Sequence, residues 1–287
     1  MAKKTLVLRA ALAALILASP VLAQQLDGTL KKIKSTSTFN IGYIESAPPF
    51  SFPGPDRRPV GYSVDLCTHV ASVLQQQLGI NLKLNWVPVT AVNRIDMVAQ
   101  GKVDIECSTT TASLSRQQRV DFSLMTFVDG GGLLTKSDLN LRGTADLADK
   151  RIAVIPGTTT EGALNKFLKE EFVAAKVVPV KDHLEGRGAV EKGSVEAFAS
   201  DRGILIGLVV TSKEPSIFAM PNLQFSYEPY GFMLRRNDAD FRLAVNRALA
   251  GLYRSGKVIQ IYDRWFGALG KPSQALQAMY LLNGLPE

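Results

Sequence analysis

Residues 61–79 have the sequence GYSVDLCTHVASVLQQQLG, which predicts an amphipathic α-helix. Its apolar side chains recur every three or four residues and so share one face, and Gly79 is a residue type that ends helices. The apolar positions are Val64, Cys67, Val70, Ala71, Leu74 and Leu78. A helix with one apolar face must pack against other elements, so the segments around it decide the fold class.

The flanking segments predict strands. Residues 39–44 and 103–107 have the length and composition of strands, and apolar residues alternate with polar ones over 82–86. Thr90 is placed to cap a helix that runs to Gln100. The order strand, helix, strand, helix, strand indicates an α/β layer with a mostly parallel sheet, and ligand sites gather at the carboxyl ends of such strands.

The same order recurs farther along the chain. Strands are expected at 151–155, 176–180 and 195–199, with helices that begin near Thr159 and after Asp182. The repeated order predicts a second α/β unit.

Two extended segments are expected to connect the units. The first contains Asp129-Gly-Gly-Gly132 and continues to Lys136, and the second is 229–234, before a helix at about 238–255. A chain that leaves the first unit at the glycines and returns near Gly231 would form a hinge suited to closure on a ligand. Three glycines also occur in ordinary turns, so the glycine run alone leaves both interpretations open.

The first residues predict an export signal. Positive charges at Lys3, Lys4 and Arg9 precede an apolar run, and residues 19–23 suit cleavage after Ala23. The apolar run is shorter than the roughly 20 residues of a membrane-spanning helix, so no anchor is predicted. No Cys follows the cleavage site, as lipid attachment would need. We therefore expect a periplasmic protein that diffuses freely.

These patterns predict a division of the chain into four parts. The parts are a signal peptide (1–23), a first lobe (24–129 plus 231–267), a second lobe (130–230) and a C-terminal extension (268–287). Because 46% of the residues are apolar, the chain can supply a hydrophobic core for large domains.

Composition also narrows the class of partner. The formal net charge of +7 includes three positive charges of the leader, and no long run of Lys or Arg occurs, so nucleic-acid binding is not indicated.

Cys67 and Cys107 are the only cysteines, which excludes a disulfide-dense scaffold. One hypothesis is a disulfide between them, since the first lies on the core face of the predicted helix and the second ends a strand expected beneath it. Two buried free thiols are the alternative.

The motifs of common enzyme classes are missing. The sequence has no Gly-x-Ser-x-Gly elbow, no Gly-x-Gly-x-x-Gly fingerprint, no phosphate loop and no paired metal-ligand spacing. His69 and His183 are the only histidines, so neither a zinc site nor a His-based triad is indicated. We expect no metal, no cofactor and no catalysed reaction.

Polar residues follow the predicted strands in an arrangement suited to a zwitterion. Ser108-Thr-Thr-Thr111 and Arg116 follow one strand, Pro156-Gly-Thr-Thr-Thr160 follows another and Asp201 a third. Arg and the backbone N–H groups at a helix start near Thr159 donate to carboxylates, while Asp accepts from an ammonium group. Each residue type also serves as a helix cap, a solvated side chain or a turn residue. Their placement together favours a ligand site.

Several short motifs occur together in a fixed order. They are Gly61-Tyr-Ser-Val-Asp-Leu66, Asp104-Ile-Glu-Cys-Ser-Thr-Thr-Thr111, Arg116-Gln117, Asp121-Phe-Ser123, Gly157-Thr-Thr159, Lys181-Asp-His183, Ala197-Phe-Ala-Ser-Asp201 and Tyr262-Asp-Arg-Trp-Phe266. With them the chain resembles the family 3 solute-binding proteins of amino-acid ABC transporters, most closely the glutamate/aspartate-binding branch. The resemblance covers nearly the whole chain after the leader.

The resemblance implies an α/β fold of the type II periplasmic-binding-protein class, with two crossover strands joining two lobes, each a mixed, mostly parallel sheet flanked by helices. It also implies a monomer that closes on an amino acid and delivers it to a membrane permease. By the same resemblance, Arg116, Thr109 and Thr111 clamp the ligand α-carboxylate, Thr159 adds contacts from the second lobe, and Asp201 takes the α-ammonium group.

The sequence determines the contacts of the ligand side chain less fully than those of the α-carboxylate and α-ammonium groups. In the glutamate/aspartate branch, positions matching Arg94 and His183 face that side chain and favour a distal carboxylate. The branch has Arg where this chain has Ile44, and Ser where it has Ala91. One charge-assisted hydrogen bond fewer weakens a dicarboxylate by ~1.5–3 kcal/mol, which would let an amide side chain compete. An acidic ligand is expected, with glutamine or asparagine as the alternative.

Two other functions are compatible with the same fold. Cyclohexadienyl dehydratases resemble this family and use a pocket carboxylic acid to expel water, but Asp201 is expected to be committed to an ammonium group. A sensor that presents its ligand to a chemoreceptor or kinase would use the same closed surface.

Overall fold

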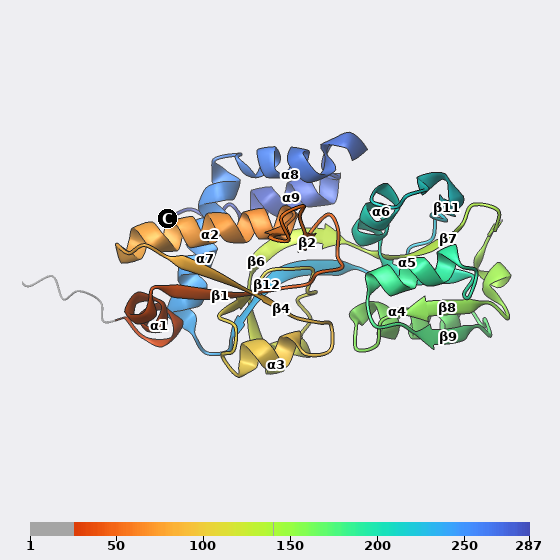
Figure 1. The fold of residues 1–287 in the computed structure, drawn as a ribbon, viewed down its shortest axis with the longest axis horizontal. Coiled ribbons are helices and arrows are strands. Elements are labelled where there is room, and N and C mark those ends of the chain that lie inside the picture. Colours follow the sequence, from red (N-terminus) through yellow and green to blue (C-terminus); the bar gives the residue numbers. More distant parts are fainter. Residues whose placement is uncertain (1–25, 140) are drawn as a thin grey trace, which may run out of the picture.

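The computed structural model describes residues 26–139 and 141–287, and Figure 1 shows their arrangement. Two five-stranded sheets, each packed with helices, lie side by side along the long axis of the molecule. We call the β4-β1-β5-β12-β6 sheet with its helices the first unit, and the β11-β7-β10-β8-β9 sheet with its helices the second unit. The predicted signal peptide lies outside the described residues.

The first sheet is mixed. Strand β1 (Thr38–Tyr43) runs parallel to β4 (Lys83–Pro88) and β5 (Ile105–Glu106). Strand β12 (Glu228–Arg235) runs antiparallel to β5 and to β6 (Val120–Asp129). The strand predicted at 103–107 is therefore present but shorter.

Helix α2 (Tyr62–Leu78) confirms the amphipathic pattern, because its six predicted core positions are between 0 and 4% exposed. Gly79 ends the helix in the left-handed conformation, with φ 62°, as its lack of a Cβ atom allows. Helix α3 (Arg94–Ala99) is shorter than expected. Thr90 does not cap it directly, and instead its hydroxyl accepts a hydrogen bond from the N–H of Asn93, at 3.2 Å.

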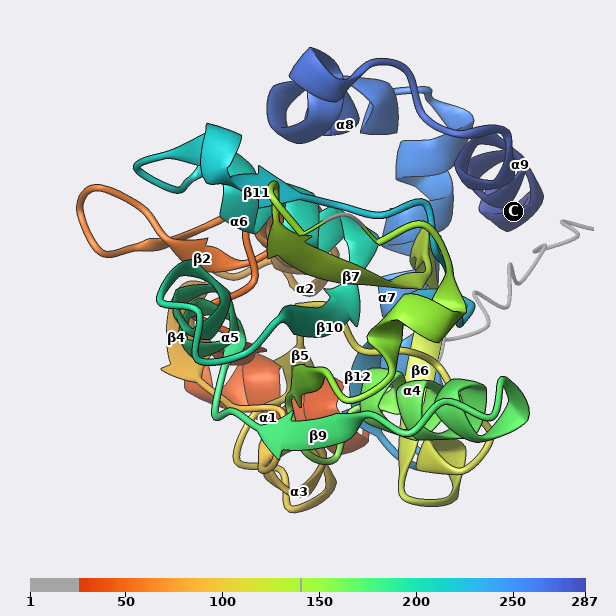
Figure 2. The same cartoon turned by 90° about the vertical axis from the view of Figure 1, so that its right-hand side faces the viewer.

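The second sheet repeats the α/β order. Strand β8 (Arg151–Val154) lies parallel to β9 (Lys176–Pro179) and β10 (Ala197–Asp201), and β10 lies antiparallel to β7 (Gly131–Lys136). Strand β11 (Phe218–Ala219) pairs antiparallel with β7 and forms one edge of the second sheet. The helices are α4 (Thr159–Glu170), α5 (His183–Glu191) and α6 (Arg202–Val210), which surround the strands in Figure 2.

The remaining elements lie in the first unit. They are α1 (Gly28–Thr36), the hairpin of β2 (Phe52–Pro53) and β3 (Pro59–Val60), α7 (Ala239–Arg254), α8 (Val258–Phe266) and α9 (Gln274–Asn283). Helix α9 packs against β6 and α7, and its Tyr280 hydroxyl lies 2.8 Å from that of Tyr62. None of the helices among the described residues combines the length and apolarity needed to span a bilayer.

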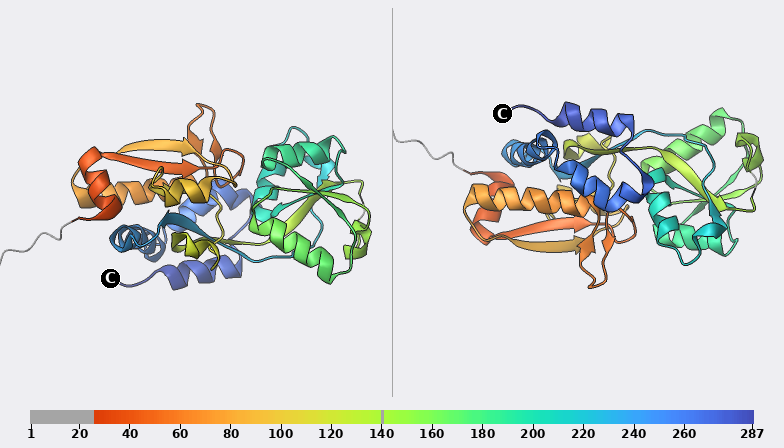
Figure 3. Two further views of the ribbon diagram at one scale, coloured as in Figure 1. Left: turned by 90° about the horizontal axis from the view of Figure 1, so that it is seen from below. Right: turned by 90° about the horizontal axis from the view of Figure 1, so that it is seen from above.

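Two adjacent crossover segments join the units (Figure 3). Strand β6 ends at Asp129 in one sheet, and β7 begins at Gly131 in the other, while Glu228 of β12 pairs with Asp129. The glycines form this extended crossover and not a tight turn. A Cβ atom at any of them would overlap Gln224, Phe225 or Arg202, so glycine is needed here for close packing. The predicted α/β fold with two sheets and two crossover strands is confirmed.

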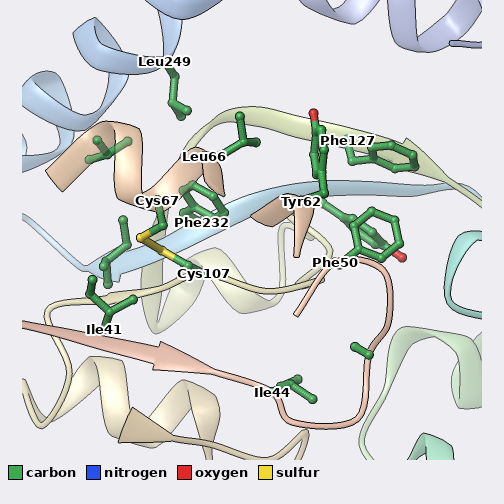
Figure 4. Packing of buried hydrophobic residues seen from close by; sticks show 14 of the residues in the cluster. Ile41, Ile44, Phe50, Tyr62, Leu66, Cys67, Cys107, Phe127, Phe232 and Leu249 are labelled. Carbon is green, nitrogen blue, oxygen red and sulfur yellow. A yellow bond between two sulfur atoms is a disulfide. The ribbon is translucent and has the colours of Figure 1, made fainter. Parts of the chain in front are cut away.

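Cys67 of α2 and Cys107, just after β5, form a disulfide in the core of the first unit, with a Cα–Cα distance of 6.1 Å (Figure 4). Both residues are 0% exposed. Of the two alternatives left open by the sequence, the structure shows the bridge.

The bridge closes a loop of 40 residues, and in the loop-entropy treatment a loop of that length contributes about 4 kcal/mol. We therefore expect reduction to lower the free energy of unfolding by about 2–4 kcal/mol, as measured by urea denaturation with and without a reductant. The double variant Cys67→Ala/Cys107→Ala is the control, since the reductant should not change its curve. Identical curves for the wild-type protein would contradict the expectation.

Candidate ligand-binding site

A cavity lies between the two units, where residues that follow β1 and β5 face residues that follow β8, β9 and β10. It is lined by Ile44, Ala91, Arg94, Thr109, Thr111, Ile155, Thr158, Thr159, Thr160, His183, Ala199, Ser200, Asp201 and Ile204. A second cavity of about 170 Å³ adjoins it and shares Ile44, Ala91, Ile155 and His183. The first cavity has a volume of about 20 Å³, room for roughly one water molecule. A molecule as large as an amino acid therefore does not fit in the first cavity unless the lining residues of the two units move apart.

Arg116 and two threonines form the side of the site in the first unit. Thr109, Thr111 and Arg116 are 5, 6 and 8% exposed, and the Arg116 Nη1 donates to the carbonyl oxygen of Thr111 at 3.0 Å. Burial and the nearby Arg94 guanidinium lower the pKa of Arg116 to about 10, so the side chain stays charged at neutral pH. Arg116 is not among the residues that line the cavity, but it contacts Thr111, which does.

Glu228, which the sequence analysis missed, joins the two units at this site. Its Oε2 accepts hydrogen bonds from the hydroxyls of Thr111 and Thr159, at 2.5 and 2.7 Å. Ser226 donates to its Oε1 at 2.7 Å. Glu228 is 1% exposed, although its side chain is polar. An acidic residue directly before the expected crossover strand at 229–234 was the signal that could have found it.

Asp201 ends β10 on the opposite side of the cavity. Its Oδ1 accepts from the Thr160 hydroxyl at 2.8 Å, and its Oδ2 accepts from the Tyr230 hydroxyl. Burial, together with the carboxylates of Glu228 and Asp129, raises the pKa of Asp201 to about 7. A cationic group in the cavity would favour the ionised form.

Arg94, the first residue of α3, is buried and forms no ion pair with another described residue. It is 4% exposed and lines the cavity, and its Nε has no hydrogen-bond partner within the described part of the chain. None of the ion pairs formed by the described residues involves it. Glu106, 0% exposed, is a carboxyl group that interacts with it electrostatically, and burial raises the pKa of Glu106. A buried unpaired guanidinium is costly, and an anionic ligand would offset that cost.

His183 begins α5 and lies 7% exposed at the cavity. Burial and the Arg94 charge lower its pKa to about 4, so the imidazole is neutral at pH 7. Its Nδ1 lies 3.1 Å from the Oγ of Ser46, a residue of the first unit that the sequence analysis also missed. The position of Ser46, three residues after β1, was the available signal.

The structure brings the expected residues together. Six of the seven predicted ligand-binding residues line the cavity, and the seventh, Arg116, is hydrogen-bonded to Thr111 of the lining. Ile44 and Ala91, the two positions at which the sequence analysis expected a departure from the resembled branch, also line it and present apolar side chains. The individual roles of these residues in binding stay predictions.

The arrangement defines a class of protein. Two α/β units joined by two crossover strands, with a buried polar cavity between them, form the type II periplasmic-binding-protein fold. Residues 39–268 match the bacterial extracellular solute-binding proteins, family 3, and the chain belongs to that family.

The names of similar proteins describe binding functions. The chain is 38% identical over 261 residues to the L-glutamate/L-aspartate-binding protein of Pseudomonas aeruginosa, covering 90% of this chain and 86% of the relative. It is 32% identical to the glutamate/aspartate import solute-binding protein of Escherichia coli, covering 91 and 87%. Among solved structures, an ancestral amino acid-binding protein, a precursor of cyclohexadienyl dehydratase, is 28% identical, with a TM-score of 0.73 over 83% of this chain and 100% of that one.

Proposed function

We propose that the protein is the extracytoplasmic substrate-binding component of an amino-acid ABC importer and that it closes two lobes on glutamate or aspartate. The observation that carries the proposal is the buried guanidinium of Arg94, which lines the cavity and whose Nε has no hydrogen-bond partner among the described residues. A ligand carboxylate placed beside it would supply an anionic acceptor. The names of the two relatives at 38 and 32% identity support the same ligand class.

The zwitterionic end of the ligand is assigned to the other residues of the site. Arg116, with the segment around Thr109 and Thr111, binds the α-carboxylate from the first lobe. Thr159 adds donors from the second lobe, because it begins α4 and the N–H groups of a helix start are free to donate. Asp201 binds the α-ammonium group.

The lobes are proposed to consist of residues 24–129 plus 231–267 and residues 130–230, with 268–287 as an extension packed on the first lobe. The chain is proposed to act in the periplasm as a monomer, after cleavage near Ala23, a position outside the described residues. Its partner is the membrane permease of the importer, which receives the closed, liganded form.

A competition titration tests the ligand. Glutamate, aspartate, glutamine and asparagine are titrated into the purified mature protein, and calorimetry gives the dissociation constants. An acidic amino acid should bind tightest, with leucine and phenylalanine at least 100-fold weaker, because an apolar side chain leaves Arg94 desolvated without an acceptor. Tightest binding by leucine or phenylalanine would overturn the proposal.

The dehydratase alternative has one observation in its favour, the raised pKa of Asp201, which suits an acid catalyst. Against it, the Asp201 carboxylate is the acceptor available at the cavity for an ammonium group. We propose that the protein is not an enzyme. An assay with prephenate or arogenate should show no dehydration above the uncatalysed rate.

The raised pKa of Asp201 also predicts a pH dependence of binding. Below pH 7 the empty protein carries a proton on Asp201, and the ligand ammonium group must displace it, so binding releases a proton and weakens as the pH falls. For a pKa of about 7, the dissociation constant should rise about tenfold from pH 8 to pH 6. His183 stays neutral in this range, because its pKa is about 4.

Calorimetry in two buffers of different ionisation enthalpy measures the released proton directly. At pH 6 close to one proton should be released for each ligand bound, and at pH 8 close to none. A dissociation constant that is constant from pH 6 to pH 8, with no proton released, would contradict the assignment of Asp201.

A further inference from the structure

A hydrogen bond between Ser46 and His183 is one of those that connect the two units at the cavity. The Oγ of Ser46, from the loop after β1, lies 3.1 Å from Nδ1 of His183, at the start of α5. Both residues are 7% exposed. Ser46 lines the adjoining cavity, and His183 lines both cavities. The contact therefore lies where a ligand side chain would meet the second unit.

The partners of Ser46 determine which ring nitrogen carries the proton. A neutral imidazole has one N–H donor and one acceptor nitrogen. If Nδ1 held the proton, the Ser46 oxygen would accept it, and the serine O–H would need another acceptor. Within the described residues the Ser46 hydroxyl has no other hydrogen-bond partner. If Ser46 donates instead, the serine O–H and the His183 Nδ1 are both paired, and the proton lies on Nε2.

We propose that Ser46 is a specificity-determining positioning residue that holds His183 in the Nε2–H tautomer, so that the ring and Arg94 both offer donors to the distal group of the ligand and select a carboxylate over a carboxamide. This inference rests on the proposed function and deepens it. The burial of His183 and the adjacent Arg94 charge keep the ring neutral, whereas Asp182 acts in the opposite direction.

The selection follows from the hydrogen-bonding capacity of the two distal groups. A carboxylate has only acceptors, so it satisfies two donors at once. A carboxamide offers one acceptor oxygen, and its NH₂ group would face a donor and stay unpaired. Ile44 and Ala91, which line the same cavity, provide no side-chain acceptor for that NH₂ group. Their apolar character thus favours the acid.

Nitrogen NMR tests the tautomer in the intact protein. The chain has only two histidines, so ¹⁵N-histidine labelling gives two imidazole spin systems, and the variant His69→Gln identifies that of His183. The expected result in the ligand-bound protein is a protonated Nε2 and an unprotonated Nδ1. In Ser46→Ala the fraction with protonated Nδ1 should increase. A protonated Nδ1 in the wild-type protein overturns the inference.

Binding selectivity provides the second readout. Ser46→Ala should reduce the ratio of glutamine to glutamate dissociation constants about tenfold, and Ser46→Thr, which keeps the hydroxyl, should restore it. Loss of the inter-unit contact alone would weaken both ligands equally and leave the ratio unchanged. Ser51→Ala is the matched control, because Ser51 lies in the same loop, is 0% exposed and donates to the carbonyl oxygen of Ile44 at 2.8 Å.

The outcomes separate the inference from the proposed function. A wild-type protein that prefers glutamate, combined with an unchanged ratio in Ser46→Ala, overturns the role of Ser46 alone. A wild-type protein that binds neither glutamate nor aspartate overturns the proposed function and, with it, the selection of a carboxylate.

Discussion

Replacement of Arg116 by alanine should abolish measurable amino-acid binding. Arg116 is 8% exposed, and its guanidinium donates to the carbonyl oxygen of Thr111, which lines the cavity. In the proposed role, its guanidinium binds the ligand α-carboxylate through two parallel hydrogen bonds. Removal of one partner of a buried charge pair typically costs about 3–5 kcal/mol, which corresponds to a roughly 100- to 4,000-fold loss of affinity.

Two further variants separate binding from folding. Arg116→Lys keeps the charge but loses the planar fork, so it should also bind far more weakly than the wild-type protein. Arg119→Ala is the matched control, because Arg119 lies three residues away, and its side chain is 54% exposed in an ion pair with Asp96. It should change affinity less than threefold. Circular dichroism establishes that each variant is folded, and near-native affinity of a folded Arg116 variant would refute the assignment.

Much of the fold follows from local patterns. The apolar spacing in residues 61–79 identified α2 together with its buried face, because that spacing depends only on helix geometry. The strand at 103–107 was less accurate. Asp104 lies just before β5 and still donates its backbone N–H to the Asn40 carbonyl oxygen, at 2.8 Å. Its carboxylate binds the Lys32 Nζ at 2.7 Å and the Asn40 N–H at 2.9 Å, and Lys32 belongs to α1, which local sequence does not place beside β5.

The sequence predicted the part of the candidate site whose position depends only on the topology of the sheets. Carboxyl ends of strands converge, so Thr109, Thr111 and Asp201 were expected together, and the structure places them around one cavity. Glu228 and Ser46 were missed because their partners, Thr159 and His183, belong to other elements and become neighbours only when the two units meet. No spacing within either segment encodes those contacts.

Replacement of Arg94 by methionine should remove the acid preference and stabilise the empty protein at the same time. The side chain of Met fills similar space without the buried charge of a guanidinium whose Nε has no hydrogen-bond partner among the described residues. We expect the affinity for glutamate to fall about 100-fold and that for glutamine less than threefold, so that their dissociation constants become similar. Because a buried charge without an ion-pair partner among the described residues is removed, the free energy of unfolding of the unliganded protein should rise by about 1–2 kcal/mol.

A lower affinity for glutamate combined with a higher free energy of unfolding distinguishes a ligand-binding arginine from a structural one. A structural arginine would lower stability when replaced and would weaken acidic and amide ligands alike. Glu106 does not reverse the expectation, because it keeps the Thr110 hydroxyl, at 2.9 Å, and its raised pKa favours the neutral acid once Arg94 is absent. Urea denaturation without ligand and competition titrations of glutamate and glutamine measure both effects on one preparation. A less stable Arg94→Met that still prefers glutamate by its wild-type factor would show that Arg94 supports the fold and does not select the ligand.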